Sequence, residues 1–296
     1  MYERHFGLRE TPFGLTPDTS YFFACAPSQE ALNTLLVAAR SGEGFIKITG
    51  EVGTGKTLLC RKFLASLGDG FVSAYVPNPY LEPDVLLQVL ADDFRVARPP
   101  GIERNQLLKL LTRALLEFAR AGRRVVVCLD EAQAMPLRTL EVLRLLTNLE
   151  TEKRKLLQVV LFGQPELDHN LQDPSVRQLR QRITFQHRLR SLHADETDDY
   201  LEHRLRVAGF RGGRLFSRAA VLATHWFSGG VPRLVNIVAH KALLLAYGRG
   251  EHAVGARDVW RAATDTPAAA RGVLRRALPL FTALLSLGGI GWVLLK

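Results

Sequence analysis

The sequence has few cysteines and lacks the short motifs of several common enzyme classes. Its three cysteines, Cys25, Cys60 and Cys128, form no CxxC pair. Their number and spacing exclude a disulfide framework and a zinc site built on such pairs, so we expect reduced thiols. None of the eight histidines belongs to an HExxH pattern, and no GxSxG is present. The chain therefore lacks the signatures of zinc metalloproteases and of serine hydrolases.

Acidic residues are outnumbered by basic ones. The 296 residues include 39 Lys and Arg against 29 Asp and Glu, which gives a net charge of +10. A basic surface favours an anionic partner such as nucleic acid, a nucleotide or a phospholipid surface, although many basic surfaces have no such role. With 47% hydrophobic and 23% charged residues, the composition is that of a globular chain with room for two domains.

The end of the sequence is a long apolar run without charge, from Ala277 to Leu295. A helix of this length nearly matches a hydrocarbon core of about 30 Å, so it predicts one transmembrane helix, with a buried terminal helix as the alternative. Arg271, Arg275 and Arg276 precede the run and only Lys296 follows it. This asymmetry predicts that the main body lies in the cytoplasm.

Apolar runs alternate with helical periods through the first two thirds of the chain, which predicts an α/β fold with a parallel sheet. Strands are predicted at 44–49, 71–77, 123–129, 157–162 and 183–187, with helices between them. A helix is predicted at 28–40, capped by Ser28. After about Leu192 three helical patterns predict a small all-α domain. The predicted domains are 1–191 for nucleotide binding, 192–266 for the helical domain, 267–276 for a linker and 277–295 for the transmembrane helix.

The stretch GEVGTGKT fits the phosphate-binding pattern GxxxxGK[ST], and it lies between a predicted strand and a predicted helix. In that context the N–H groups of the loop and the positive end of the helix can bind phosphates. Lys56 would contact the β- and γ-phosphates of ATP, and the Thr57 hydroxyl would bind Mg²⁺. The predicted binding residues are Gly50, Glu51, Val52, Gly53, Thr54, Gly55, Lys56, Thr57 and Leu58.

A second motif, VVVCLDEAQ, is a predicted buried strand that ends in two carboxylates. Asp130 is predicted to share the Mg²⁺ with Thr57, and Glu131 to polarise the attacking water. Positioning of the nucleophile supplies much of the catalysis in phosphoryl transfer, so this pair favours a hydrolase.

Other polar residues suggest a site completed between subunits. Gln164 follows the predicted strand 157–162 and is expected to contact the γ-phosphate or the water. One of Arg177, Arg180 and Arg182 is expected to act on a neighbouring subunit's nucleotide. Arg233 lies in the first turn of a predicted helix, against the helix dipole, which favours a functional role for it at the γ-phosphate.

With these residues in place, the chain resembles the AAA+ ATPases of the initiator and clamp-loader branch. Four stretches, HFGLRETPFGLTPDTSYFF, GEGFIKITGEVGTGKTLLCRKFL, LLTNLETEKRKLLQVVLFGQPELD and RQLRQRI, resemble the ExeA/GspA family of secretion ATPases, and within it the pilus-biogenesis branch. The resemblance covers about residues 1–266. It implies an inner-membrane ATPase that uses ATP and Mg²⁺, forms a homo-oligomeric ring and acts with pilus or secretion assembly proteins, while nucleic acid is not expected as a partner.

The resemblance also implies individual roles. Gln164 matches sensor 1, and Arg233 matches sensor 2, which would bind the nucleotide. Arg182 matches the arginine finger, with Arg180 as the alternative. The segment around Pro12 and Phe13 would pack near the adenine. ExeA-like members continue into a peptidoglycan-binding domain, whereas the present sequence ends at Lys296. We therefore expect a partner to supply any contact with the cell wall.

Two other functions remain open. A DNA-binding regulator of the initiator or transposition type is supported by the +10 charge and the arginines of 177–190, although no recognition helix is evident. An ATP-gated scaffold that hydrolyses negligibly would require Glu131 to be idle.

Overall fold

The computed structural model describes residues 1–151 and 154–270, and these form two compact units. The α/β unit runs from Ala24 to Arg190. The helical unit combines Met1–Phe23 with the described residues from Ser191 up to residue 270. The first 23 residues therefore belong to the helical unit, whereas their place in the sequence assigned them to the nucleotide-binding domain at 1–191. Their contacts with the helical unit, given below, are the physical reason for this correction.

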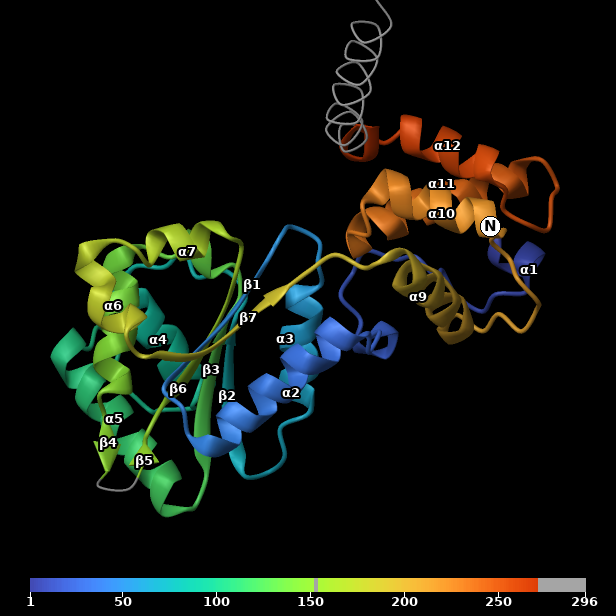
Figure 1. The fold of residues 1–296 in the computed structure, drawn as a ribbon. Helices are drawn as coiled ribbons and strands as arrows, with labels where there is room; N and C mark the ends of the chain where they lie inside the picture. The colour runs from blue at the N-terminus through green and yellow to red at the C-terminus, as the bar shows by residue number, and fades with distance from the viewer. Residues whose placement is uncertain (152–153, 271–296) are drawn as a thin grey trace, which may run out of the picture. The chain divides into compact units, whose positions relative to one another are not determined.

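The α/β unit is built on one sheet of five parallel strands in the order β2-β3-β6-β1-β7 (Figure 1). This confirms the predicted five-stranded parallel sheet. In chain order the strands are β1 (Phe45–Gly50), β2 (Phe71–Val76), β3 (Arg124–Leu129), β6 (Gln158–Gly163) and β7 (Ile183–Leu189).

Helices cover both faces of this sheet (Figure 1). Helices α2 and α3 pack on one face, against β1, β6 and β7, and helices α4, α5 and α6 pack on the other, against β2, β3 and β6. Strand β6 is buried at all six positions, as expected for a central parallel strand covered on both faces. The helices of the unit are α2 (Ala26–Ser41), α3 (Lys56–Ala65), α4 (Pro83–Asp93), α5 (Arg104–Arg120), α6 (Leu137–Thr147), α7 (Glu166–Asn170) and α8 (Arg177–Arg180).

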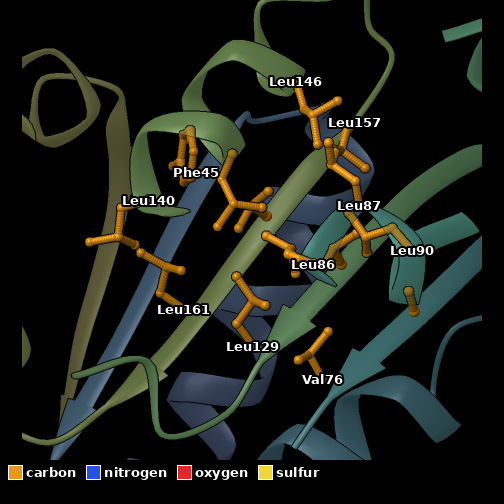
Figure 2. Packing of buried hydrophobic residues seen from close by; sticks show 14 of the residues in the cluster. Phe45, Val76, Leu86, Leu87, Leu90, Leu129, Leu140, Leu146, Leu157 and Leu161 are labelled. Carbon is orange, nitrogen blue, oxygen red and sulfur yellow. The ribbon is translucent and has the colours of Figure 1, made fainter. Parts of the chain in front are cut away.

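The largest apolar cluster lies between the sheet and helices α4, α5 and α6 (Figure 2). Leu87 of α4, Leu140 of α6 and Leu161 of β6 are fully buried in it. Alternate residues of β3 point to opposite faces, so Val127 and Leu129 join this cluster while Val126 and Cys128, equally buried, face α2 and α3. The apolar runs in the sequence are thus explained by burial on two sides.

One local prediction for the α/β unit is corrected, and one small element was not predicted. Helix α2 begins at Ala26, with Cys25 at the N-cap and Pro27 in its first turn, so Ser28 lies inside the helix and does not cap it. Proline suits this position because its fixed φ is already helical and its missing N–H would have no helical partner. The sequence pattern also missed the short hairpin of β4 (Glu150–Thr151) and β5 (Arg154–Lys155), whose strands are too short and too charged to give a strand signal.

In the part of the chain that the structure describes, the helical unit contains the three predicted helices and further short ones. These are α9 (Ala194–Val207), α10 (Arg218–Ser228), α11 (Pro232–Gly248) and the unpredicted α12 (Ala256–Thr264); α1 (Glu3–Phe6) and a 3-10 turn at Thr19–Tyr21 come from the N-terminal segment. Helix α12 has only nine residues, and its buried stripe of Val259, Ala262 and Ala263 is narrow, which explains why the pattern missed it. Residues 267–270, the described part of the predicted linker, are also helical.

Arg204 of α9 ties the N-terminal segment to the helical unit. Its guanidinium donates to the carbonyl oxygens of Pro12 at 2.6 Å and Gly14 at 3.2 Å, and lies 4.5 Å from the ring centre of Tyr21. The side chain is buried among these groups. Nearby, Phe13 packs edge to face on Phe216 with ring centres 5.9 Å apart. These contacts explain why residues 1–23 fold with the helices.

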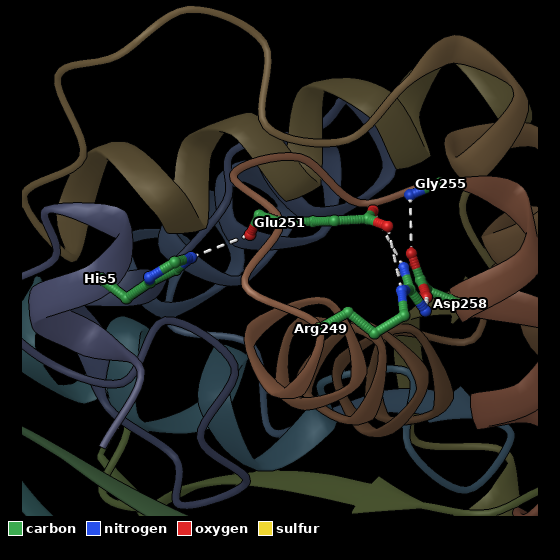
Figure 3. Close-up of polar contacts among 5 residues, drawn as sticks. All are labelled: His5, Arg249, Glu251, Gly255 and Asp258. Atoms are coloured by element: carbon green, nitrogen blue, oxygen red, sulfur yellow. Dashed lines mark hydrogen bonds and ion pairs between the residues drawn. The ribbon is translucent and has the colours of Figure 1, made fainter.

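A second polar cluster joins the start of α12 to the end of α11 (Figure 3). Arg249 forms ion pairs with Asp258 and with Glu251, and Asp258 also accepts a hydrogen bond from the Gly255 N–H at 3.0 Å. His5 of α1 is hydrogen-bonded to the Glu251 carbonyl oxygen, with 2.9 Å between the atoms. The loop before α12 is thus held by α1, α11 and α12 together.

The predicted inner-membrane location is corrected. Over residues 1–151 and 154–270, no helix is long and apolar enough to cross a membrane. The run 277–295, on which the prediction rested, lies outside the described residues. The location consequently has no structural support.

Candidate nucleotide site

The predicted site residues follow the carboxyl ends of three neighbouring strands. Thr49 of β1 pairs with Gly163 of β6, and Leu129 of β3 pairs with Leu161 of β6. The loop after β1, the carboxylates after β3 and Gln164 after β6 therefore meet at one edge of the sheet. This edge is where parallel α/β sheets bind ligands.

The loop after β1 is shaped by its glycines. Gly53 and Gly55 have φ values of 84° and 98°, a region that residues with a Cβ rarely adopt. A Cβ on Gly50 would lie 2.8 Å from Thr54 Oγ1 and 3.0 Å from the Leu189 carbonyl oxygen. The Thr54 hydroxyl donates to the Glu51 carbonyl oxygen at 2.9 Å, which closes the loop on itself.

Lys56 begins α3 and is almost fully buried. Its Nζ donates to the carbonyl oxygens of Gly50 at 2.7 Å and Glu51 at 3.0 Å. Burial lowers the pKa of Lys56, although the charges of Glu131 and Asp130 oppose this shift. A buried ammonium at a helix N-terminus, beside loop N–H groups, fits a polyphosphate. Of the other predicted loop residues, Glu51 and Val52 are exposed and Leu58 is half-buried.

Asp130 follows β3 and is only 2% exposed. It accepts hydrogen bonds from the Glu131 N–H at 3.0 Å, from the Tyr75 hydroxyl at 3.3 Å and from Thr57. Burial raises the pKa of Asp130, and these hydrogen bonds oppose the rise. The structure thus joins Thr57 and Asp130, a hydroxyl and a carboxylate of the kind that bind Mg²⁺ beside phosphates.

Glu131 has a strained backbone and a tightly held side chain. Its φ is 51°, which is uncommon for a residue other than glycine and is often found at functional sites. Its Oε2 accepts from Gln133 Nε2 at 2.6 Å and from Gln164 Nε2 at 3.0 Å. Burial raises the pKa of Glu131, but these hydrogen bonds and the charge of Lys56 outweigh it, so the pKa lies below its usual range. The side chain is therefore ionised near neutral pH.

Comparison with known proteins agrees with this arrangement. The AAA domain family matches residues 39–171, which contain Lys56, Thr57, Asp130, Glu131 and Gln164. The match lies within the α/β unit. General secretion pathway protein A of Aeromonas hydrophila is 42% identical over 265 residues, 90% of this chain and 48% of that protein. This identity supports the ExeA/GspA family of AAA+ proteins, and the chain spans about half the length of that relative.

Solved structures share the fold over most of this chain. The Aeropyrum pernix ORC2 protein, in ADPNP–ADP complexes, superposes with a TM-score of 0.63 at 18% identity, over 85% of this chain and 72% of that chain. The ORC1 protein of the same organism, in complex with DNA, gives 0.62 at 23% identity, over 86% and 69%. At this identity the likeness shows the AAA+ P-loop fold alone.

The three arginines considered for the arginine finger lie away from the loop after β1. Arg177 and Arg180 belong to α8, and Arg182 directly precedes β7. Ile183 pairs with Phe45, the first residue of β1, so Arg182 lies at the amino end of the sheet, about 17 Å along β1 from Gly50. The structure therefore does not bring these arginines to the nucleotide site of their own subunit.

Two predicted residues belong to the helical unit. Arg233 is exposed in the first turn of α11, and its role as sensor 2 stays a prediction. Phe13, from the segment expected near the adenine by the family resemblance, is 2% exposed and packs on Phe216. The role of this segment at the adenine stays a prediction.

Two residues of the site were missed from the sequence. Tyr75 reaches Asp130 from the end of β2, a contact that no motif indicated. Gln133 stands inside the recognised stretch VVVCLDEAQ but was given no role. Its position two residues after Glu131 was the only available signal, and the hydrogen bonds become evident only in the folded site.

Proposed function

We propose that this chain hydrolyses ATP with Mg²⁺ as cofactor and uses hydrolysis to drive or regulate the assembly of secretion machinery. The observation that carries the proposal is the meeting of Lys56, Asp130, Glu131 and Gln164 at one sheet edge. A phosphate-binding loop alone would suit any nucleotide-binding protein. An ionised carboxylate held beside it suits hydrolysis.

Each residue has a distinct task in this proposal. Lys56 and the N–H groups of the loop bind the phosphates, and Thr57 with Asp130 holds the metal ion. Bound Mg²⁺ neutralises charge that develops on the phosphate oxygens. Glu131 accepts a proton from the attacking water or orients it, and Gln164 senses the γ-phosphate.

The secretion task is supported by the identity to General secretion pathway protein A. Within that family we propose the assembly of a type IV pilus, because the motifs most resemble those of MshM, the biogenesis protein of the mannose-sensitive haemagglutinin pilus. Partners are then pilus or secretion assembly proteins. Homo-oligomerisation into a ring would let Arg182, or Arg180, act on a neighbour's nucleotide, which agrees with their distance from the loop of their own subunit.

The test compares Glu131→Gln with the wild-type protein. We expect ATP affinity to stay within about threefold while turnover falls by about a hundredfold or more, since positioned general bases contribute on that order. Glu117→Gln, an exposed carboxylate near the end of α5, is the matched control and should leave both unchanged. Equal turnover in Glu131→Gln and wild type would favour the idle-Glu131 scaffold instead. Co-purification with Glu131→Gln and ATP identifies the client.

A DNA-binding regulator is the second candidate. It is favoured by the net charge of +10. The fold shared with the ORC proteins agrees with it but does not identify a ligand. Binding of the protein to duplex DNA should then weaken steeply with salt, because phosphate contacts release counterions. Enrichment of DNA rather than assembly proteins by Glu131→Gln would select this function.

A further inference from the structure

A closed ring of hydrogen bonds joins Glu131, Gln133 and Gln164. Gln133 Nε2 and Gln164 Nε2 both donate to Glu131 Oε2, at 2.6 Å and 3.0 Å. The amide oxygen of Gln133, Oε1, accepts the backbone N–H of Gln164 at 2.9 Å. Gln133 therefore uses both ends of its amide to link the carboxylate after β3 with the strand end after β6.

The position of Gln133 is itself fixed from two sides. Asn170 of α7 donates its Nδ2 to the Gln133 carbonyl oxygen at 2.9 Å. On β6, Gly163 leaves room for the amide, since a Cβ there would lie 3.3 Å from Gln133 Oε1. A side chain whose backbone and amide are both held loses little further freedom when it holds another group.

We propose that Gln133 is a positioning residue of the ATPase site: it holds the Glu131 carboxylate by Oε2 and couples it to Gln164. The proposal rests on the proposed function, because positioning of Glu131 matters for turnover only if Glu131 acts on the attacking water. A carboxylate oxygen accepts about two hydrogen bonds, so the two amides fill Oε2 and direct Oε1 to the water.

The strained backbone of Glu131 agrees with this role. A φ of 51° is unfavourable in a residue with a Cβ and persists only where the surrounding structure enforces it. Such strain is concentrated at functional sites. Two charged groups also lie near the carboxylate, Lys56 of α3 and Asp130 directly after β3.

Two substitutions separate the hydrogen bonds of Gln133 from its bulk. Gln133→Met keeps a side chain of similar length but removes the donor and the acceptor. Gln133→Glu keeps the acceptor for the Gln164 N–H and replaces the donor by a carboxylate facing Glu131. We expect kcat to fall in the order wild type, Gln133→Met, Gln133→Glu, because the first substitution removes the hydrogen bond that holds the Glu131 carboxylate and the second places a like charge against it. Gln172→Met, an exposed glutamine after α7, is the matched control.

Turnover and ATP binding are then measured on the full chain. We expect Gln133→Met to lower kcat for ATP about tenfold to a hundredfold with KM within about twofold, because the hydrogen bonds position Glu131 and do not bind the nucleotide. A residue that served only packing would lower stability without this selective loss of kcat. Wild-type kcat in both variants would overturn the proposal.

Hydrogen exchange distinguishes this proposal from the proposed function, because it needs no hydrolysis. In Gln133→Met the backbone N–H of Gln164 loses its acceptor, so we expect its exchange, followed by NMR, to become about tenfold faster or more, while Gln172→Met leaves it unchanged. A wild-type protein that lacks turnover would refute the ATPase, yet faster exchange at Gln164 would still support its coupling to Gln133. Equal exchange rates in wild type and Gln133→Met would overturn the coupling, whatever the turnover.

Discussion

The ammonium group of Lys56 donates to the carbonyl oxygen of Gly50 at 2.7 Å, so the first residue of α3 is bonded to the last residue of β1. A second hydrogen bond, to the Glu51 carbonyl oxygen, lies on the same loop. The phosphate-binding loop is thus held closed by the side chain that is proposed to bind the phosphates. The shape of the loop and the positive charge that would bind the phosphates therefore depend on one side chain, that of Lys56.

Lys56→Met should abolish nucleotide binding while the fold persists. The substitution keeps the apolar stem but removes the charge and both hydrogen bonds to the loop. We expect ATP affinity to fall by about a hundredfold or more, since two or more charge-assisted hydrogen bonds of about 1.5–3 kcal/mol are lost. Titration with a fluorescent ATP analogue measures this. Lys62→Met on the same helix should bind normally; equal loss in both variants would point to a damaged helix instead.

Gly230→Ala should destabilise the helical unit far more than Gly250→Ala. Both glycines have positive φ, 68° and 70°, so both variants carry backbone strain of about 1–2 kcal/mol. Only at Gly230 would the new Cβ lie 2.0 Å from the Leu192 carbonyl oxygen, whereas nothing lies within 4 Å at Gly250. We expect a loss above about 4 kcal/mol for Gly230→Ala. Urea unfolding of both variants measures it, and equal losses would contradict the packing at Leu192.

Arg204→Met should loosen the N-terminal segment from the helical unit. It leaves the carbonyl oxygens of Pro12 and Gly14 without their donor, at a cost of about 1–3 kcal/mol for the buried acceptor of Pro12. Hydrogen exchange of residues 1–23 should rise with it. Arg206→Met removes only an exposed ion pair with Glu202 and should change stability by less than about 1 kcal/mol. Unchanged exchange in Arg204→Met would show that other contacts hold the segment.

The stability of the helical unit should fall in acid through Asp258 (Figure 3). Burial raises the pKa of this carboxyl, but hydrogen bonds from Arg249 and the Gly255 N–H outweigh it, so the folded pKa lies below the unfolded value of about 3.9. The stabilisation is therefore complete above about pH 4 and is lost as pH falls towards the folded pKa.

Asp258→Asn should lower stability at pH 7 and flatten its decline in acid. Thermal unfolding between pH 7 and pH 3 measures both effects. Asp265→Asn is the control, since the carboxylate of Asp265 is largely exposed and its ion pair with Lys241 lies at the surface. An acid decline of Asp258→Asn as steep as that of wild type would assign the effect to other carboxyls.

The elements best anticipated from the sequence are those whose signal is local. The five strands were found because burial on both faces of a parallel sheet demands continuous apolar runs, as in β6. The glycines of the phosphate-binding loop were found because their backbone conformations exclude side chains, as at Gly53 and Gly55. Helix α12 was missed, since its nine residues bury only a narrow stripe.

The sequence by itself determined the sheet, the phosphate-binding loop and the paired carboxylates Asp130 and Glu131, because composition and spacing along one strand or turn dictate them. Only the tertiary structure decided that residues 1–23 fold with the helical unit, that Tyr75 reaches Asp130, and that Gln133 links Glu131 to Gln164. These contacts join residues from 31 to 246 positions apart in the chain or depend on side-chain direction at a turn. No local pattern encodes them, since they arise from which strand ends become neighbours when the sheet forms.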